Sequence, residues 1–322
     1  MPLICLLPST DWDFPIFKVL ANNDTGAAAG HQGGVVIPKD LRGFFPGLAG
    51  TASSGNPTLD SRIKAELFIE NEYKARVSTR YQFQTWGAKR SPESRLTDPL
   101  GPLRNAARGG DILLIQRSMD HLDLFRLTLA RQTSAEFAEL SPIVGGRTWG
   151  VLYENTPPVS DDDLNAARTD EKVSEGSLFQ LFDPAALYTT STATKVARSI
   201  AFRESVLGLY NRTCALCGEG LKSPSGLIES EAAHVVPRSM RGTDDARNGL
   251  ALCKSHHWAF DRGLFGVGDD RAIVVPRSVG ALPQNARLQG MAGAPIKEAS
   301  QPELAVHPAA FKWHRDNILL AK

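Results

Sequence analysis

The sequence predicts an α+β protein of two domains. At 322 residues the chain is long enough to fold as two separate units. Residues 151–194 are rich in acidic and hydroxyl side chains and show little hydrophobic periodicity, which is typical of a linker with some helix. Three of the four cysteines lie within residues 214–257, which indicates a compact unit after that linker. We therefore expect domains at residues 1–150 and 195–322.

The N-terminal domain combines a strand pattern with a basic, aromatic segment. Residues 111–115 form an apolar run that predicts a strand. Over residues 74–108, eight basic residues stand against two acidic ones, a net charge of +6, with aromatic side chains interleaved. Such a segment suits a polyanion, although a solvated sheet face is the simpler alternative. Over residues 154–175 the balance reverses to −5, with seven acidic and two basic residues.

The C-terminal domain shows short alternating elements. Apolar residues near helical spacing predict helices over residues 193–210 and 308–321. Apolar and β-branched runs predict strands at residues 227–237, 264–267 and 272–275. A polar loop and a short helix are expected between the first two strands.

Two pairs of residues have the spacing of a structural zinc site. Two residues separate Cys214 from Cys217, and two separate Cys253 from His256. A tight turn lets both members of a pair point at one ion, and three thiolates with one imidazole suit tetrahedral Zn²⁺. Reduced, buried thiols are the alternative. Cys5 is expected to pack as a small hydrophobic residue, and disulfides are not expected in a chain of this length.

A second set of polar residues in the same window is left over after the zinc ligands. His234 lies in an expected strand, Asn248 in the polar loop and His257 in the short helix. His257 and Asp261 are four residues apart, so on a helix they share a face and can bind one cation together. Alternatively, His234 is an ordinary core histidine and Asn248 caps a turn.

The order of strand, loop and helix with His, Asn and His resembles the HNH nucleases, whose fold is the ββα-metal finger. The resemblance covers about residues 196–276 and includes Ala-His-Val-Val-Pro, Asn-Gly-Leu-Ala-Leu-Cys and His-His-Trp-Ala-Phe-Asp-Arg-Gly. It implies that His234 is the general base that activates water and that Asn248 holds the imidazole or the loop. It also implies that His257, with Asp261, binds a catalytic Mg²⁺ or another divalent ion.

The sequence departs from that family at one position. Many HNH enzymes carry a metal-binding residue directly before the base, where this chain has Ala233. Glu231 lies on the same face of the strand and could replace it; a solvated carboxylate is the alternative. His256 and His257 are adjacent, so either could serve either metal. Helix geometry favours pairing His257 with Asp261.

Residues 18–38, which include Asn-Asn-Asp-Thr-Gly and Gly-His-Gln-Gly-Gly, closely resemble the N-terminal recognition domain of EcoRII-type restriction enzymes. The resemblance continues in residues 85–92 and covers about residues 10–135. It implies a mainly β DNA-binding pseudobarrel whose two arms, here residues 18–32 and 80–91, read bases in the major groove. A simple turn is the alternative for Asn-Asp-Thr-Gly. The expected DNA contacts are Lys18, Asn22, Asn23, Asp24, Thr25, His31, Gln32, Arg80, Trp86, Lys89 and Arg90.

Together the resemblances imply a type II restriction enzyme that cuts double-stranded DNA at a specific sequence and leaves 5′-phosphate and 3′-hydroxyl ends. One ββα site cuts one strand, so we expect a homodimer. A cognate DNA methyltransferase is the implied partner. A nuclease that requires a methylated base and a non-catalytic, zinc-held DNA-binding regulator remain alternatives. No stretch reaches the length of a membrane span and residues 1–8 lack a signal-peptide pattern, so we expect a soluble, cytoplasmic protein.

Overall fold

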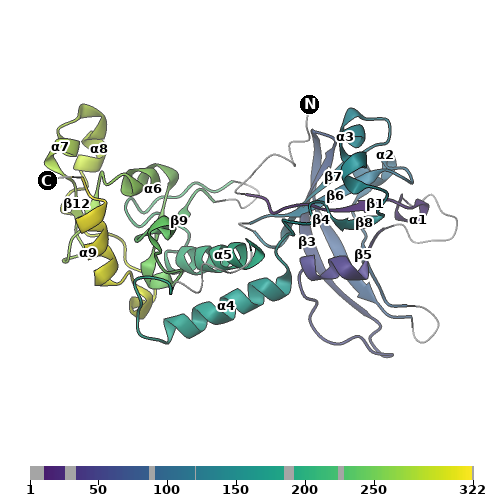
Figure 1. The fold of residues 1–322 in the computed structure, drawn as a ribbon, viewed down its shortest axis with the longest axis horizontal. Coiled ribbons are helices and arrows are strands. Elements are labelled where there is room, and N and C mark those ends of the chain that lie inside the picture. Colours follow the sequence, from purple (N-terminus) through teal and green to yellow (C-terminus); the bar gives the residue numbers. More distant parts are fainter. Residues whose placement is uncertain are drawn as a thin grey trace. The chain divides into compact units, whose positions relative to one another are not determined.

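The chain divides into two compact units, Met1–Asp163 and Leu164–Lys322 (Figure 1). The boundary falls within helix α4 (Asp161–Glu175), so the acidic stretch contains a regular helix of 15 residues. Three aspartates in its first turn lie where the helix dipole favours negative charge. The computed structural model describes residues 11–25, 34–86, 91–119, 121–184, 192–223 and 228–320.

Unit 1 is built on one curled eight-stranded sheet with the order β2-β5-β4-β3-β7-β6-β1-β8 (Figure 1). Strands β3 and β4 form a long hairpin, and β3 also pairs with β7 in parallel. The mainly β N-terminal domain expected from the sequence therefore forms. Its strands are β1 (Ile16–Val19), β2 (Val35–Ile37), β3 (Thr58–Ile69), β4 (Glu72–Gln84), β5 (Glu93–Leu96), β6 (Ile112–Arg117), β7 (Leu124–Ala130) and β8 (Trp149–Val151).

Strand β6 explains how the sheet carries a core on each face. Leu113 and Ile115 lie in the main core of unit 1, whereas Ile112 and Leu114 belong to a second cluster with helix α3 (Ala135–Val144). Successive side chains of a strand point to opposite faces, so a strand covered on both sides needs a continuous apolar run. This is why residues 111–115 show no alternation. The shorter helices of unit 1 are α1 (Asn22–Thr25), η2 (Lys39–Phe44) and α2 (Gly101–Ala106).

Unit 2 packs a short hairpin and several helices around a second core. Strands β9 (Glu231–His234) and β10 (Gly249–Leu252) pair antiparallel, with His234 opposite Gly249 and Glu231 opposite Leu252. Helix α5 (Thr192–Leu209) packs on both strands. The remaining elements are α6 (Lys254–Asp261), β11 (Gly266–Val267), β12 (Ile273–Val274), α7 (Arg277–Gly280), α8 (Ala286–Gln289), α9 (Pro308–Asn317) and the 3₁₀ turns η4 (Arg238–Met240), η5 (Ala246–Asn248), η6 (Pro283–Asn285) and η7 (Pro302–Leu304).

The predicted C-terminal elements are confirmed in type and order. Helix α5 has its expected length, whereas α9 and the strands are shorter than expected. The strand predicted over residues 227–237 ends at His234, because the next two backbone amides bond to Asn248. The Val235 N–H donates to its carbonyl and the Val236 N–H to its side chain. In the part of the chain that the structure describes, no helix is both long and apolar enough to cross a membrane.

Candidate active site and metal sites

Four side chains of unit 2 form a compact soft-metal cluster. The ligand atoms of Cys214, Cys217, Cys253 and His256 all lie within 4.8 Å of one another. Nδ1 of His256 is 3.4 Å from Sγ of Cys214 and 3.2 Å from Sγ of Cys253. These three cysteines form no disulfide; Cys5 lies outside the described residues.

The environment of this cluster fits a bound cation. Burial raises the pKa of the Cys214 thiol to about 12 and also raises the pKa of Cys253. A thiolate at either position therefore needs a positive charge beside it, which a coordinated metal supplies. Three sulfurs and one imidazole are the donor set of a structural Zn²⁺ site, and the arrangement is compatible with one.

A second group of possible metal ligands surrounds His257, the residue that follows His256. His257 Nδ1 is 2.7 Å from Glu231 Oε2, and His257 Nε2 is 3.5 Å from Asp261 Oδ2. Glu231 comes from β9, and the other two residues come from one face of α6. The structure thus places His256 with the thiols and brings His257 together with both carboxylates.

Charge couples these three side chains. The hydrogen bond to His257 holds the pKa of Glu231 below its usual value, and the same bond raises the pKa of His257. Burial raises the pKa of Asp261, against the opposing charges of His257, Arg262 and His234. Two carboxylates and one imidazole, all partly exposed, are oxygen and nitrogen donors that suit a harder divalent ion than the thiol cluster does.

His234 lies at the end of β9, three residues after Glu231. Its Nε2 atom is 3.0 Å from Asp244 Oδ1, and its ring stacks on Phe202 with the centroids 3.9 Å apart. Asp244 lies in the polar loop before β10 and Phe202 in α5. Neither was expected as a site residue. A loop carries no periodic signal, and an apolar residue of an amphipathic helix looks like ordinary core, so the pattern did not reveal either contact.

Asn248 is fully buried and fastens the loop that carries Asp244. Its Oδ1 atom accepts from Val236 N at 2.8 Å, while Nδ2 donates to the carbonyls of Val236 and Thr243 at 3.1 and 2.9 Å. Of the two tasks expected for Asn248, these bonds correspond to holding the loop. Gly242 makes this packing possible, because a Cβ there would lie 1.8 Å from the Val236 carbonyl oxygen.

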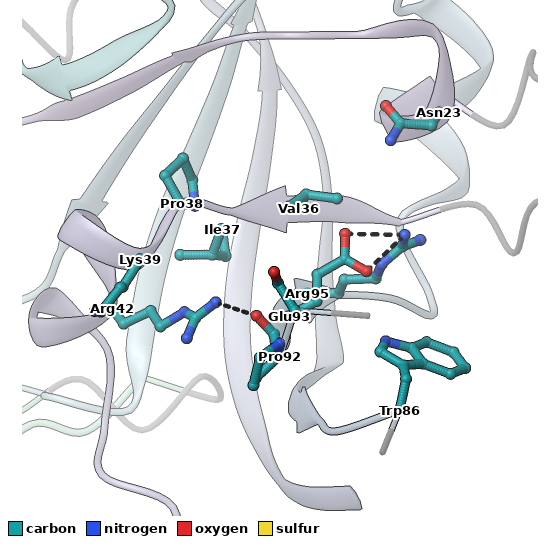
Figure 2. Close-up of a pocket in the computed structure, with 11 residues that line it drawn as sticks. Asn23, Val36, Ile37, Pro38, Lys39, Arg42, Trp86, Pro92, Glu93 and Arg95 are labelled. Carbon is teal, nitrogen blue, oxygen red and sulfur yellow. Dashed lines mark hydrogen bonds and ion pairs between the residues drawn. The ribbon is translucent and has the colours of Figure 1, made fainter. Parts of the chain in front are cut away.

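Unit 1 contains a cavity of about 410 Å³, lined by polar and apolar side chains, between β2, β5 and Trp86 (Figure 2). The Arg95 guanidinium pairs with Glu93 at 3.0 Å, and Figure 2 draws this pair between Asn23 and Trp86. Trp86 is 38 % exposed. The cavity therefore offers a flat aromatic face beside hydrogen-bonding groups of both kinds.

The other expected DNA contacts of unit 1 lie in different environments. Lys18 and Asp24 form a buried ion pair of 2.7 Å, and Asp24 also accepts from the backbone amides of Ala21 and Val36. These two side chains therefore differ from the expectation: they hold α1 against β1 and β2 instead of facing outward. Arg80 pairs with Asp60 across the β3–β4 hairpin. Asn22 is exposed and Thr25 half-buried. His31, Gln32, Lys89 and Arg90 lie outside the described residues.

Comparison with known proteins identifies the class of this site. Residues 214–268 match the family model described as HNH endonuclease, and this segment contains the thiol cluster, His234, Asn248, His257 and Asp261. An HNH endonuclease domain therefore lies within unit 2.

Eleven solved chains match this protein, whereas no curated protein does. The chain is similar to one titled "Modification dependent TagI restriction endonuclease", with 25% sequence identity and a TM-score of 0.30. The similarity covers 37% of this chain and 38% of that chain, so the matched region spans well under half of either protein.

Proposed function

We propose that this protein is a double-stranded DNA endonuclease of the type II restriction class, with recognition in unit 1 and hydrolysis in unit 2. The observation that carries the proposal is the grouping of His234 with Asp244, and of His257 with Glu231 and Asp261, inside an HNH endonuclease domain. The thiol cluster is separate from both groups. A protein that used this domain only as a zinc-held scaffold would need the thiol cluster alone.

The residues have distinct tasks in the proposed reaction. His234 takes a proton from the water that attacks phosphorus, because an imidazole is the usual general base. His257, Asp261 and Glu231 would hold a divalent ion such as Mg²⁺, which when bound supplies positive charge to the phosphate and the leaving 3′-oxygen. Asn248 keeps the loop beside His234 in place. The products carry 5′-phosphate and 3′-hydroxyl ends.

Recognition is assigned to the cavity of unit 1 and to the two arms expected at residues 18–32 and 80–91, which lie partly outside the described residues. The Arg95 and Asn23 side chains carry donors and acceptors that suit base edges, and Trp86 offers an apolar surface. Because one HNH domain cuts one strand, we propose a homodimer acting on a palindromic or near-palindromic site. Such an enzyme requires a cognate methyltransferase that protects the host's own sites.

The test is cleavage of phage DNA with Mg²⁺ by the parent and by His234→Ala. The parent should give discrete fragments, and the variant should bind DNA but not cut it. His307→Ala is the matched control, because His307 caps α9 in the same unit and stacks on Phe179. Full cleavage by His234→Ala would remove the proposed base. A smear of fragments from the parent would indicate a non-specific nuclease.

A second candidate is a nuclease that requires a modified base. The cavity of unit 1 favours it, since a base turned out of the duplex could stack on Trp86 and bond to the Glu93–Arg95 pair. Matched methylated and unmethylated plasmids separate the two candidates. Cutting of only the methylated plasmid supports this one, and cutting of only the unmethylated plasmid supports a restriction enzyme.

A further inference from the structure

We propose that Asp244 is a positioning residue for His234: its carboxylate selects the ring tautomer and orientation in which Nδ1 is the nitrogen that accepts the proton. This inference rests on the proposed function, because it assigns His234 as the base. It adds a residue that neither the sequence pattern nor the family match singles out.

The geometry at His234 fixes the ring in two ways. A carboxylate can only accept a hydrogen bond, so the 3.0 Å contact with Asp244 Oδ1 places a hydrogen on Nε2. A neutral imidazole carries one hydrogen, which leaves the lone pair on Nδ1. The Phe202 ring lies 13° from parallel to the imidazole and restrains the plane in which it can turn.

Two arginines hold the carboxylate of Asp244. Arg198 Nη2 is 3.1 Å from Oδ2, and Arg238 Nε is 3.4 Å from Oδ1. Burial acts to raise the pKa of Asp244, but the hydrogen bond to His234 and the charges of both arginines outweigh it, so the pKa lies below its usual value. The group therefore stays ionised, as an acceptor for Nε2–H must.

Asp183 completes this ion cluster from the segment before α5. Its Oδ2 atom is 2.9 Å from Arg198 Nη2 and 2.5 Å from Arg238 Nη1, so each guanidinium lies between two carboxylates. The Asp183 N–H also donates to the carbonyl of Arg241 at 2.9 Å, which ties the segment to the same loop. Two positive and two negative charges balance, so the cluster can remain in place when His234 is neutral.

The arrangement also suits the charge that develops during the reaction. The water oxygen forms its bond to phosphorus as the bond to the 3′-oxygen breaks, and the water proton moves to Nδ1 of His234. The resulting imidazolium keeps its Nε2–H directed at Asp244, whose negative charge stabilises it. The proton on Nδ1 then passes to solvent, and the 3′-oxygen takes a proton from solvent.

Asp244→Asn is the most informative variant. The Arg198 donor lies nearer to Asp244 than the Arg238 donor does, so it holds the amide oxygen at the Oδ2 position and turns the NH₂ group toward Nε2 of His234. An NH₂ group donates, so His234 must accept through Nε2 and carry its hydrogen on Nδ1. The size of the side chain is unchanged, but the nitrogen meant to accept the proton is blocked.

Two measurements on the whole 322-residue chain, loaded with zinc, test this. Imidazole ¹⁵N NMR, with His234 assigned by the signal lost in His234→Ala, should report hydrogen on Nε2 in the parent and on Nδ1 in Asp244→Asn. Steady-state cleavage at saturating DNA with Mg²⁺ should show kcat lower by roughly 100- to 10,000-fold, with DNA affinity in Ca²⁺ retained. Asp244→Glu keeps the carboxylate and should recover part of kcat.

Asp245→Asn is the matched control. Asp245 is the neighbouring buried carboxylate, but it pairs with Arg247 at 2.6 Å and does not contact His234. Its variant should keep the parent's tautomer and kcat even if its melting temperature falls.

Three results would overturn the inference: a parent His234 with its hydrogen on Nδ1, an Asp244→Asn variant with the parent's kcat, or equal losses of kcat in Asp244→Asn and Asp245→Asn. Failure of the proposed function looks different, because His234→Ala would then still cut DNA. The tautomers of His234 in the parent and in Asp244→Asn test the role of Asp244 whether or not His234→Ala still cuts DNA.

Discussion

Lowering the pH should destabilise unit 2 through one buried histidine, His314 of α9. Its ring stacks on Phe260 with the centroids 3.8 Å apart, and its Nε2 atom is 3.0 Å from the Phe260 carbonyl oxygen. Within the described part of the chain, Nδ1 is buried without a hydrogen-bond partner. A second proton on this ring would therefore introduce a buried charge with no acceptor.

The size of the effect follows from the pKa of His314 in the two states. Burial lowers the pKa to about 4 in the folded protein, whereas the side chain in the unfolded chain titrates near 6.5. The unfolded state thus binds the proton more tightly. The stability from the neutral ring is complete above pH 6.5, falls as the pH drops and levels off below about pH 4. A difference of roughly 2.5 pKa units corresponds to about 3 kcal/mol.

Urea unfolding of the parent and of His314→Gln between pH 7 and pH 4 measures this. Glutamine can still donate to the Phe260 carbonyl but does not titrate in this range. Any zinc held by the thiol cluster is lost from both proteins alike, so the difference between their pH profiles isolates His314. The parent should lose about 3 kcal/mol more than the variant. Parallel profiles would refute the burial argument.

Three further perturbations test the packing around the site. Cys253→Ser should abolish stoichiometric zinc binding, measured by elemental analysis, and lower the melting temperature of unit 2; a variant that keeps one zinc per chain would exclude the thiol cluster as the site. Asn248→Ala leaves buried partners at Val236 and Thr243 unpaired and should cost about 3 kcal/mol in denaturant unfolding; a change near zero would contradict the loop-holding task. Gly263→Ala places a Cβ 2.0 Å from the Ile318 carbonyl oxygen at a φ of +66°, whereas Gly293→Ala, at +80°, meets nothing within 4 Å. Gly293→Ala should cost about 1–2 kcal/mol for the backbone alone and Gly263→Ala clearly more, so equal melting temperatures would contradict the close approach of Ile318 to Gly263.

Ligand spacing was the most informative signal in the sequence. Cys-x-x-Cys, Cys-x-x-His and the i, i+4 pair of His257 and Asp261 are local relationships that a turn or one helix fixes, and the structure brings each set together. Glu231 was an open alternative, and its 2.7 Å contact with His257 now places it beside that imidazole. Its position could also be predicted locally, because side chains two residues apart on a strand, here Glu231 and Ala233, lie on the same face.

The contacts that the sequence could not give depend on tertiary packing. Asp244 reaches His234 because Asn248 and Gly242 fold the loop back onto β9, which no residue pattern encodes. Lys18 and Asp24 were expected to contact DNA, yet these two residues, six apart with a helix start between them, form an ion pair inside unit 1. A polar composition shows that a segment carries charges, but only the fold decides whether those charges face solvent or each other.

Sequencing the ends of genomic DNA fragments tests the central claim most directly, because it reads site, stagger and end chemistry together. With Mg²⁺, the parent should give ends at one short sequence carrying 5′-phosphates, and His234→Ala should give none above background. Ends that are absent from the parent digest, or equally abundant in both digests, would contradict a hydrolytic site built on His234.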